Sequence, residues 1–132
     1  MPAVVDTHAA IWYLLDLDRL SQRVYSLIDG AAASGFPTYI SAVSLVEVVY
    51  LVERGRILAD AFEIFERQLE QKNPAFTVVP LDRQIASTLR SIPRSVVPDM
   101  PDRIIAATAL HLRLPLVTRD RRLQTAGIET IW

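Results

Sequence analysis

The chain has 132 residues, of which 51% are hydrophobic, and this is the size and apolar content of one compact domain. Its 14 basic and 15 acidic residues give a net charge of −1, which excludes a strong overall attraction to polyanions, so any nucleic-acid affinity has to be local. The absence of cysteine excludes a disulfide framework, a thiolate zinc site and a cysteine nucleophile, and we expect any bound metal to be held by oxygen.

The first residues, Met1 to Asp6, lack the basic start and the long apolar stretch that a secretory signal requires. No uninterrupted apolar run approaches the roughly 20 residues that are needed to cross a bilayer. We therefore expect a cytoplasmic protein that makes no membrane contact.

Short β-branched runs alternate along the chain with longer segments that carry helix signals. Strands separated by helices cannot pair as hairpins, so the pattern predicts a three-layer α/β/α domain over residues 1–132, with a mostly parallel sheet of roughly five strands. The predicted strands are Ala3 to Val5, Thr38 to Ile40, Phe76 to Val79, Leu116 to Thr118 and Glu129 to Ile131. The predicted helices begin at Ser21, Ser44, Asp60, Asp82 and Asp102, and the first three end near Gly35, at Gly55 and before Asn73-Pro74.

Two aspartates directly follow predicted strands, at the edge where parallel α/β sheets bind their ligands. Asp6 follows the first strand, and Asp120 has the same relation to the run Pro115 to Thr118. Each carboxylate should project from the C-terminal edge of the sheet. Helix N-capping explains either residue alone as well as a functional role does, because aspartate is a strong capping residue.

Glu47 lies within the run Leu45 to Val52, which is so apolar that this helix must be buried nearly all round. A lone carboxylate in such surroundings needs a partner. The alternative to a functional role is a capping box, because Ser44 and Glu47 have the Ser-x-x-Glu spacing of that motif.

Asp102 follows the segment Pro93 to Pro101, which holds three prolines and Asp99. We expect this segment to run rigidly over the surface into the next helix. Capping of that helix would explain Asp102 by itself, and Asp99 either supports Asp102 or faces solvent.

The predicted topology gathers four carboxylates on one rim of the sheet, which separate capping roles do not explain. Asp6 and Asp120 follow strands, while Glu47 and Asp102 lie in the first turns of helices that begin at the same edge. Carboxylates this close raise one another's pKa unless a cation neutralises them. Oxygen ligands suit Mg²⁺ or Mn²⁺, which orient water for attack on a phosphodiester and neutralise charge on the leaving oxygen. Metal-dependent phosphodiester hydrolysis is the chemistry that fits best.

Hydroxyl and guanidinium groups flank the same rim. Thr7 and Thr118 could bind a water molecule or a phosphate oxygen, although the simpler explanation of Thr7 is that it ends a strand. A group of arginines could supply the local positive field that attracts an RNA backbone, and a solvated charged face explains them equally well. These arginines are Arg103, Arg119, Arg121 and Arg122.

The remaining residues with chemical potential receive no catalytic role. His8 and His111 lack the spacing of a metal-binding pair. Trp12 falls in a helical segment and is expected in a core or an interface, with no support for base stacking.

Four segments carry these motifs, and each is weak alone: Val4 to His8, Ser41 to Glu47, Asp99 to Ala109 and Pro115 to Asp120. Their order and spacing resemble those of PIN-domain nucleases, in particular the VapC toxins of bacterial toxin–antitoxin pairs. The resemblance covers essentially the whole chain.

The resemblance implies that Asp6, Glu47, Asp102 and Asp120 are the family's acidic quartet around Mg²⁺ or Mn²⁺, with Thr118 as the hydroxyl of its Thr-x-Asp segment. Similar members usually have Asp-Pro-Phe-Asp where this chain has Asp99-Met100-Pro101-Asp102, so the role of Asp99 stays open.

The resemblance also implies a homodimer and a partner antitoxin, whose C-terminal segment lies in a groove between helices and places a basic residue in the acidic pocket. The predicted helix Asp60 to Gln71 either offers a docking surface or packs within its own domain. Its apolar residues are Ala61, Phe62, Ile64, Phe65 and Leu69.

The main hypothesis is therefore an endoribonuclease toxin that its antitoxin holds inactive. One alternative is a PIN nuclease of RNA maturation or decay outside toxin systems. Another is a receiver-like module that binds Mg²⁺ without hydrolysing anything, but this needs a lysine across the pocket. The single lysine, Lys72, is far in chain order from the end of any predicted strand. No motif encodes the RNA target.

Overall fold

The computed structural model describes residues 2–132 and contains a five-stranded, entirely parallel sheet. The strand order is β3-β2-β1-β4-β5, so β1 lies at the centre. The predicted strands are confirmed, and their ends differ by one residue at most. They are β1 (Ala3–Val5), β2 (Thr38–Ser41), β3 (Phe76–Val79), β4 (Leu116–Val117) and β5 (Thr130–Ile131).

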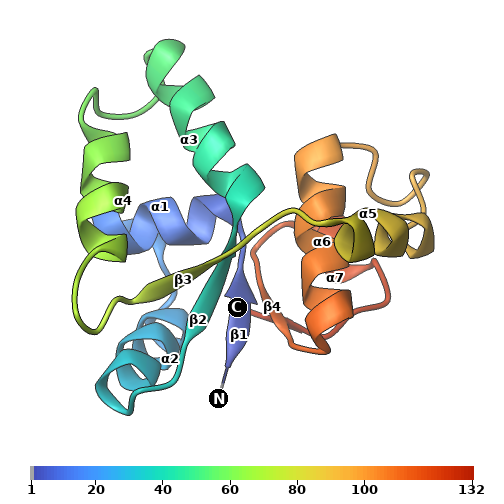
Figure 1. Cartoon of the computed structure of the whole chain (residues 1–132), viewed down its shortest axis with the longest axis horizontal. Helices are drawn as coiled ribbons and strands as arrows, with labels where there is room; N and C mark the ends of the chain where they lie inside the picture. The colour runs from blue at the N-terminus through green and yellow to red at the C-terminus, as the bar shows by residue number, and fades with distance from the viewer. Residues whose placement is uncertain (1) are drawn as a thin grey trace.

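Helices cover both faces of the sheet, and Figure 1 shows the resulting three layers. On one side lie α1 (Thr7–Leu15), α2 (Gln22–Ala33), α3 (Ala42–Glu53) and α4 (Ala61–Leu69). On the other side lie α5 (Arg83–Thr88), α6 (Met100–Leu112) and α7 (Arg121–Gln124). Two single turns of 3-10 helix, η1 (Leu17–Arg19) and η2 (Leu89–Ser91), follow α1 and α5.

Alternate residues of the central strand contribute to two separate cores. Ala3 and Val5 pack into the core formed with α1, α2 and α4, while Val4 packs into the core formed with α5 and α6. The alternation follows from the two-residue period of a β-strand. All three side chains are fully buried, as expected for the centre of a parallel sheet that is covered on both faces.

Two predicted helix starts are wrong, because α3 and α6 each begin about one turn earlier. Ser41 caps α3 with its Oγ, which accepts from the backbone N of Val43, whereas Ser44 is buried inside the helix. Asp99 caps α6, and its Oδ2 accepts from the backbone N of Asp102 at 3.1 Å. Pro101 lies in the first turn of α6, where a helix needs no N–H donor, so it does not mark the boundary.

The helix α4 packs within its own domain. Ala61 and Phe65 are fully buried, and Phe62 and Leu69 pack against the same core. Asp60 precedes this helix as predicted, although its side chain makes no capping hydrogen bond. The structure therefore favours the internal role of this apolar surface over a docking role.

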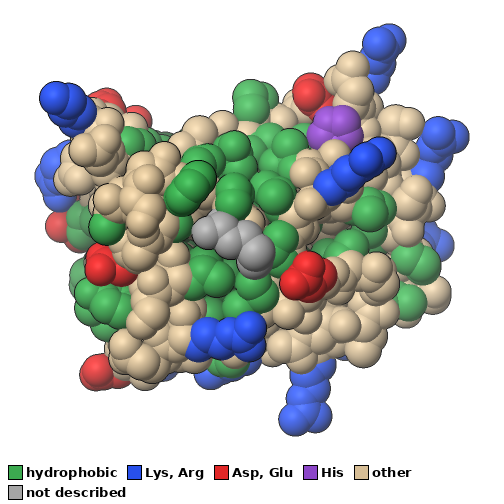
Figure 2. Space-filling model, turned by 90° about the horizontal axis from the view of Figure 1, so that it is seen from below, with side chains coloured by type: hydrophobic (Ala, Val, Ile, Leu, Met, Phe, Trp, Pro, Cys, Tyr) green, Lys and Arg blue, Asp and Glu red, His purple; other side chains and the backbone are tan. Residues whose placement is uncertain are grey.

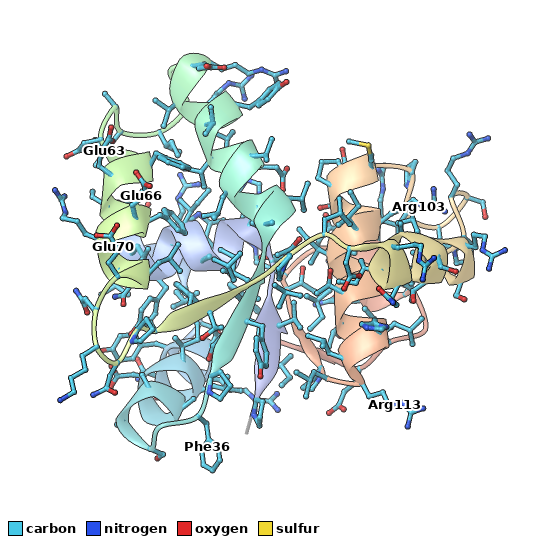
Figure 3. All side chains as sticks on the ribbon, viewed as in Figure 1. Phe36, Glu63, Glu66, Glu70, Arg103 and Arg113 are labelled. Atoms are coloured by element: carbon cyan, nitrogen blue, oxygen red, sulfur yellow. The ribbon has the colours of Figure 1, made fainter. Side chains whose placement is uncertain are left out.

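The segment between α5 and α6 is tied to the body of the protein at several points. Ile92 and Val97 are buried in the core on the α6 side. The guanidinium of Arg103 donates hydrogen bonds to the carbonyl oxygens of Leu89 and Ile92 at 2.9 to 3.1 Å. Figure 3 shows Arg103 beside this segment. Arg103 thus holds the chain that leads into the first turn of α6.

Arg113 ends α6 in the left-handed region, with a φ of 56° that is unfavourable for any residue with a Cβ. Leu114 N donates to the carbonyl of Ala109 across this turn, a pairing in which glycine is the usual residue. We expect Arg113→Gly to stabilise the fold by about 0.5–1 kcal/mol, because relief of the left-handed strain exceeds the entropic cost of glycine. Thermal unfolding measures this, and an Arg113→Gly variant that melts below the wild type would contradict it.

Figure 2 views the N-terminal edge of the sheet, where hydrophobic side chains occupy the centre and most Lys and Arg side chains lie towards the rim. The opposite edge carries the acidic residues considered below. Over residues 2–132, no helix has both the length and the apolar character needed to cross a membrane.

Candidate active site

A cavity of about 600 Å³ opens at the C-terminal edge of the sheet. It lies where β1 and β4 are neighbours and their following segments leave the sheet on different sides, a position at which α/β folds commonly bind ligands. All four predicted acids and Asp99 line it. The complete lining is Asp6, Thr7, His8, Trp12, Arg19, Glu47, Asp99, Asp102, Arg119, Asp120 and Arg122.

Asp6 both caps a helix and faces the cavity, so the two explanations offered for it are compatible. It follows β1 directly, and its Oδ1 accepts from the backbone N of Ala9 at 2.8 Å, which starts α1. Its Oδ2 accepts from the hydroxyl of Thr118, the residue after β4. The Asp6 side chain is thereby fixed between the two central strands, with only 8% of the residue exposed.

Glu47 is held by a hydroxyl rather than by a capping box. It lies in the second turn of α3, and its Oε1 accepts from the hydroxyl of Thr7. Thr7 Oγ1 also lies 2.8 Å from Ser44 Oγ, and both of these hydroxyl-bearing residues are buried. Thr7 therefore does not simply end a strand: it begins α1 and joins that helix to α3 at the wall of the cavity.

Asp102 and Asp120 complete the acidic wall from the other side of the sheet. Asp102 lies in the first turn of α6, where Asp99 caps the helix. Asp120 caps α7, because its Oδ1 accepts from the backbone N of Arg122 at 2.8 Å. Thr118 Oγ1 accepts from the backbone N of Asp120 at 3.0 Å, so one hydroxyl links Asp6 and Asp120.

The electrostatics of the cavity disfavour ionised carboxylates. Burial raises the pKa of Asp6, and the hydrogen bond from Thr118 opposes this rise only in part. Burial also raises the pKa of Glu47, with a further contribution from the charge of Asp99. The pKa of Asp102 rises from 3.8 to about 7, through burial first and then through the charges of Asp99, Asp120, Glu47 and Asp6. Without a compensating cation, burial and the neighbouring charges disfavour the ionised forms of these three acids.

A divalent cation is the group that this donor set fits. Among residues 2–132, no three Asp, Glu, His or Cys side chains are placed to hold one ion jointly as they stand. Mg²⁺ does not require this, because it keeps several waters and usually binds through one or two carboxylates. Oxygen ligands that repel one another and lack sulfur or paired imidazole partners match Mg²⁺ or Mn²⁺ in chemical type.

Only some of the predicted arginines reach the cavity. Arg119 and Arg122 line it, whereas Arg121 is exposed outside the lining. Arg103 is turned away, because its guanidinium binds backbone carbonyls between α5 and α6. Arg103 therefore holds the segment between α5 and α6 and, contrary to expectation, does not line the cavity with Arg119 and Arg122.

For three residues of the lining, no role in the site was predicted from the sequence. His8 and Trp12 are four residues apart on α1, so capping by Asp6 could have placed both on the stripe next to the cavity. Arg19 lies in η1, where it forms an exposed ion pair with Asp16 at 3.3 Å. No pattern in the sequence indicates that η1 folds back to this wall.

A model of the PIN-domain family matches residues 3–129, and the chain belongs to that family. It is 32% identical over 123 residues to Ribonuclease VapC22 of Mycobacterium tuberculosis, and the match covers 92% of this chain and 89% of that protein. The resemblance of the sequence motifs to PIN-domain nucleases is thereby confirmed.

Two solved structures each contain a chain that shares the fold over almost its whole length. VapBC2 from Rickettsia felis, bound to a DNA fragment from their promoter, contains a chain with a TM-score of 0.75 at 13% identity, covering 99% of this chain and 98% of that one. FitAcB from Neisseria gonorrhoeae contains a chain with a TM-score of 0.69 at 24% identity, and the match covers 100% of this chain and 97% of that one. At these identities the likeness establishes the fold alone.

Proposed function

We propose that this chain, as a single PIN domain over residues 1–132, is a metal-dependent endoribonuclease and the toxin of a toxin–antitoxin pair acting in the cytoplasm. The observation that carries the proposal is the cavity in which Asp6, Glu47, Asp102 and Asp120 meet at the C-terminal edge of β1 and β4. The relationship to a ribonuclease of the same family supports RNA as the substrate.

The four acids would hold Mg²⁺ or Mn²⁺, and Asp99 would add negative charge beside Asp102. When bound, the cation supplies Lewis-acid activation of water and neutralises the charge that develops on the leaving oxygen. The protein contributes orientation. Thr118 fixes Asp6 and the backbone N of Asp120, and Thr7 fixes Glu47, so two carboxylates cannot turn freely.

The cavity also offers cationic groups to the phosphate backbone of the substrate. Arg19, Arg119 and Arg122 line the same wall as the acids. With a net charge of only −1 over the whole chain, this local cluster supplies the attraction that the molecule as a whole lacks.

An antitoxin is the proposed protein partner, since one solved structure with this fold is a toxin–antitoxin complex from Klebsiella pneumoniae, which has a TM-score of 0.65 at 21% identity over 98% of this chain and 96% of that one. A groove of about 490 Å³ between α1, η1 and the α3–α4 connection adjoins the acidic cavity and shares Trp12 and Arg19 with it. A peptide lying in this groove could place a basic side chain among the acids. Val46 and Tyr50 on α3 are exposed, contrary to the expectation that this helix is buried nearly all round, and they support a homodimer contact on a different surface.

The receiver-like alternative has little structural support. Lys72 follows α4 and precedes β3, so it lies towards the N-terminal ends of the strands and does not line the acidic cavity. A PIN nuclease outside toxin systems remains the second candidate, and the gene beside this one separates the two: a short DNA-binding protein encoded there supports the toxin role.

The nuclease proposal is tested by incubating purified, partner-free protein with total cellular RNA in Mg²⁺ or Mn²⁺, beside the same mixture in EDTA. We expect discrete fragments that EDTA abolishes, because the acids cannot act without a cation. Folded, antitoxin-free protein that leaves the RNA intact in both metals would overturn the nuclease proposal and favour a binding module.

Thr118 provides a sharper test of how the acids are positioned. Its hydroxyl lowers the pKa of Asp6 against the effect of burial, so Thr118→Val should raise that pKa further. We expect cleavage to fall about 10- to 100-fold, and the acidic limb of the pH–rate profile to move to higher pH. Thr118→Ser keeps the hydroxyl and should retain most activity. A Thr118→Val enzyme with the wild-type rate and pH profile would contradict this role.

A further inference from the structure

The guanidinium of Arg119 lies over the Trp12 ring at the wall of the acidic cavity. Its guanidinium carbon is 4.7 Å from the centroid of the Trp12 ring, within the range of a cation–π contact. Both residues line the cavity that holds the acids. Arg119 also lies between Thr118 and Asp120 in the chain, so its position is coupled to the proposed catalytic groups.

Trp12 is a fixed support for this guanidinium. The residue is only 9% exposed, and Trp132 packs edge-on against its ring at 5.8 Å with an interplanar angle of 72°. The His8 ring lies 5.7 Å away at a tilt of 50°. With these neighbours Trp12 has little freedom to turn, so it offers the Arg119 guanidinium a fixed support.

Trp12 supports this guanidinium from one side, and Arg119 itself is exposed, so a ligand can approach the guanidinium from the other side. Nucleobases stack on arginine planes as well as on aromatic rings, and such stacking does not require base-specific hydrogen bonds. Lysine cannot replace arginine here, because its ammonium group has charge but no plane.

We propose that the Arg119 guanidinium, held on Trp12, is the platform on which the nucleobase next to the scissile phosphodiester stacks. This inference rests on the proposed ribonuclease function and assigns Arg119 to base binding as well as to charge. Trp12 acts as the positioning residue beneath it. The base, the Arg119 plane and the Trp12 ring would then form a three-layer stack at the rim of the acidic cavity.

The test separates stacking from charge by removing either the plane or the base. Binding is measured by fluorescence anisotropy in Mg²⁺ with labelled RNA hexamers of each base and with a hexamer of abasic ribose phosphate, all on an Asp6→Asn background to prevent turnover. The added variants are Arg119→Lys, Trp12→Phe and, as the matched control outside the cavity, Arg121→Lys. Circular dichroism confirms that each variant is folded.

We expect Arg119→Lys to weaken binding of base-bearing hexamers about 5- to 100-fold, which is the range expected for one stacked base, and to leave abasic binding unchanged. Trp12→Phe should give a smaller loss, and Arg121→Lys none on either probe. An equal loss on both probes would reduce Arg119 to a phosphate contact and overturn the proposal, as would no loss on either. Base-dependent binding by a protein that never cleaves RNA would instead reject the nuclease function and leave the platform in place.

Discussion

Replacing Asp6 with asparagine is expected to lower RNA cleavage by more than about 100-fold while the fold is retained, because a direct ligand should matter more than the outer contacts whose loss costs about 10- to 100-fold. The amide oxygen of asparagine can still accept from the backbone N of Ala9, so the start of α1 is preserved. The negative charge needed to bind a cation is lost.

The matched control for this variant is Asp82→Asn. Asp82 also caps a helix, accepting from the backbone N of Ile85 at 2.9 Å, but it does not line the acidic cavity. Cleavage rates and circular dichroism spectra of both variants separate a catalytic loss from a capping loss. An Asp6→Asn protein that is folded and cleaves RNA within a few-fold of the wild-type rate would contradict the proposed role of Asp6.

The second large effect is a loss of stability of the metal-free protein as the pH rises. The folded-state pKa of Asp102 is about 7, above the ordinary value of 3.8 for an aspartate, so the ionised form is disfavoured in the folded state. Its protonated form is compatible with the fold at low pH, and stability is lost as the pH rises from about 4 to about 7. Asp6 and Glu47, whose pKa values are also raised, act in the same direction.

The full shift in the pKa of Asp102 corresponds to a free-energy difference of about 4 kcal/mol. Solvent screening of this partly exposed carboxyl reduces the expected effect on the free energy of unfolding to about 1–2 kcal/mol. Urea denaturation in EDTA at several pH values between 4 and 8 measures it. Asp102→Asn should flatten the pH dependence and unfold at a higher urea concentration than the wild type at pH 8. Wild-type stability that stays constant or increases over this interval would show that burial and mutual repulsion do not disfavour the ionised acids in the folded protein.

The sheet was predictable because its strands read as short β-branched runs, both at the buried centre in Ala3–Val5 and at the partly exposed edge in Phe76–Val79. The starts of α3 and α6 were not. Each of these helices has two potential capping residues one turn apart, Ser41 with Ser44 and Asp99 with Asp102. Local sequence cannot choose between such pairs, since tertiary contacts decide which side chain turns to the backbone and which turns to the cavity.

The four acids could be predicted because parallel strands bring their C-terminal ends to one edge, whatever the details of each helix start. Side-chain direction could not be predicted in the same way. Arg103 and Arg119 are both arginines beside an acid of the site, yet Arg103 binds the carbonyls of Leu89 and Ile92 while Arg119 rests on Trp12. Which contact forms depends on the fold of η2 and on the approach of the C-terminal Trp132, neither of which is encoded locally.

The most direct test of the acidic cavity as a metal centre is calorimetric titration of Mn²⁺ into the metal-free wild type, Asp102→Asn and the Asp82→Asn control. We expect saturable binding by the wild type and the control, weaker or absent binding by Asp102→Asn, and competition by Mg²⁺. A wild-type protein that takes up no Mn²⁺, or an Asp102→Asn protein that binds it as tightly as the wild type does, would contradict the assignment of these carboxylates to a divalent cation.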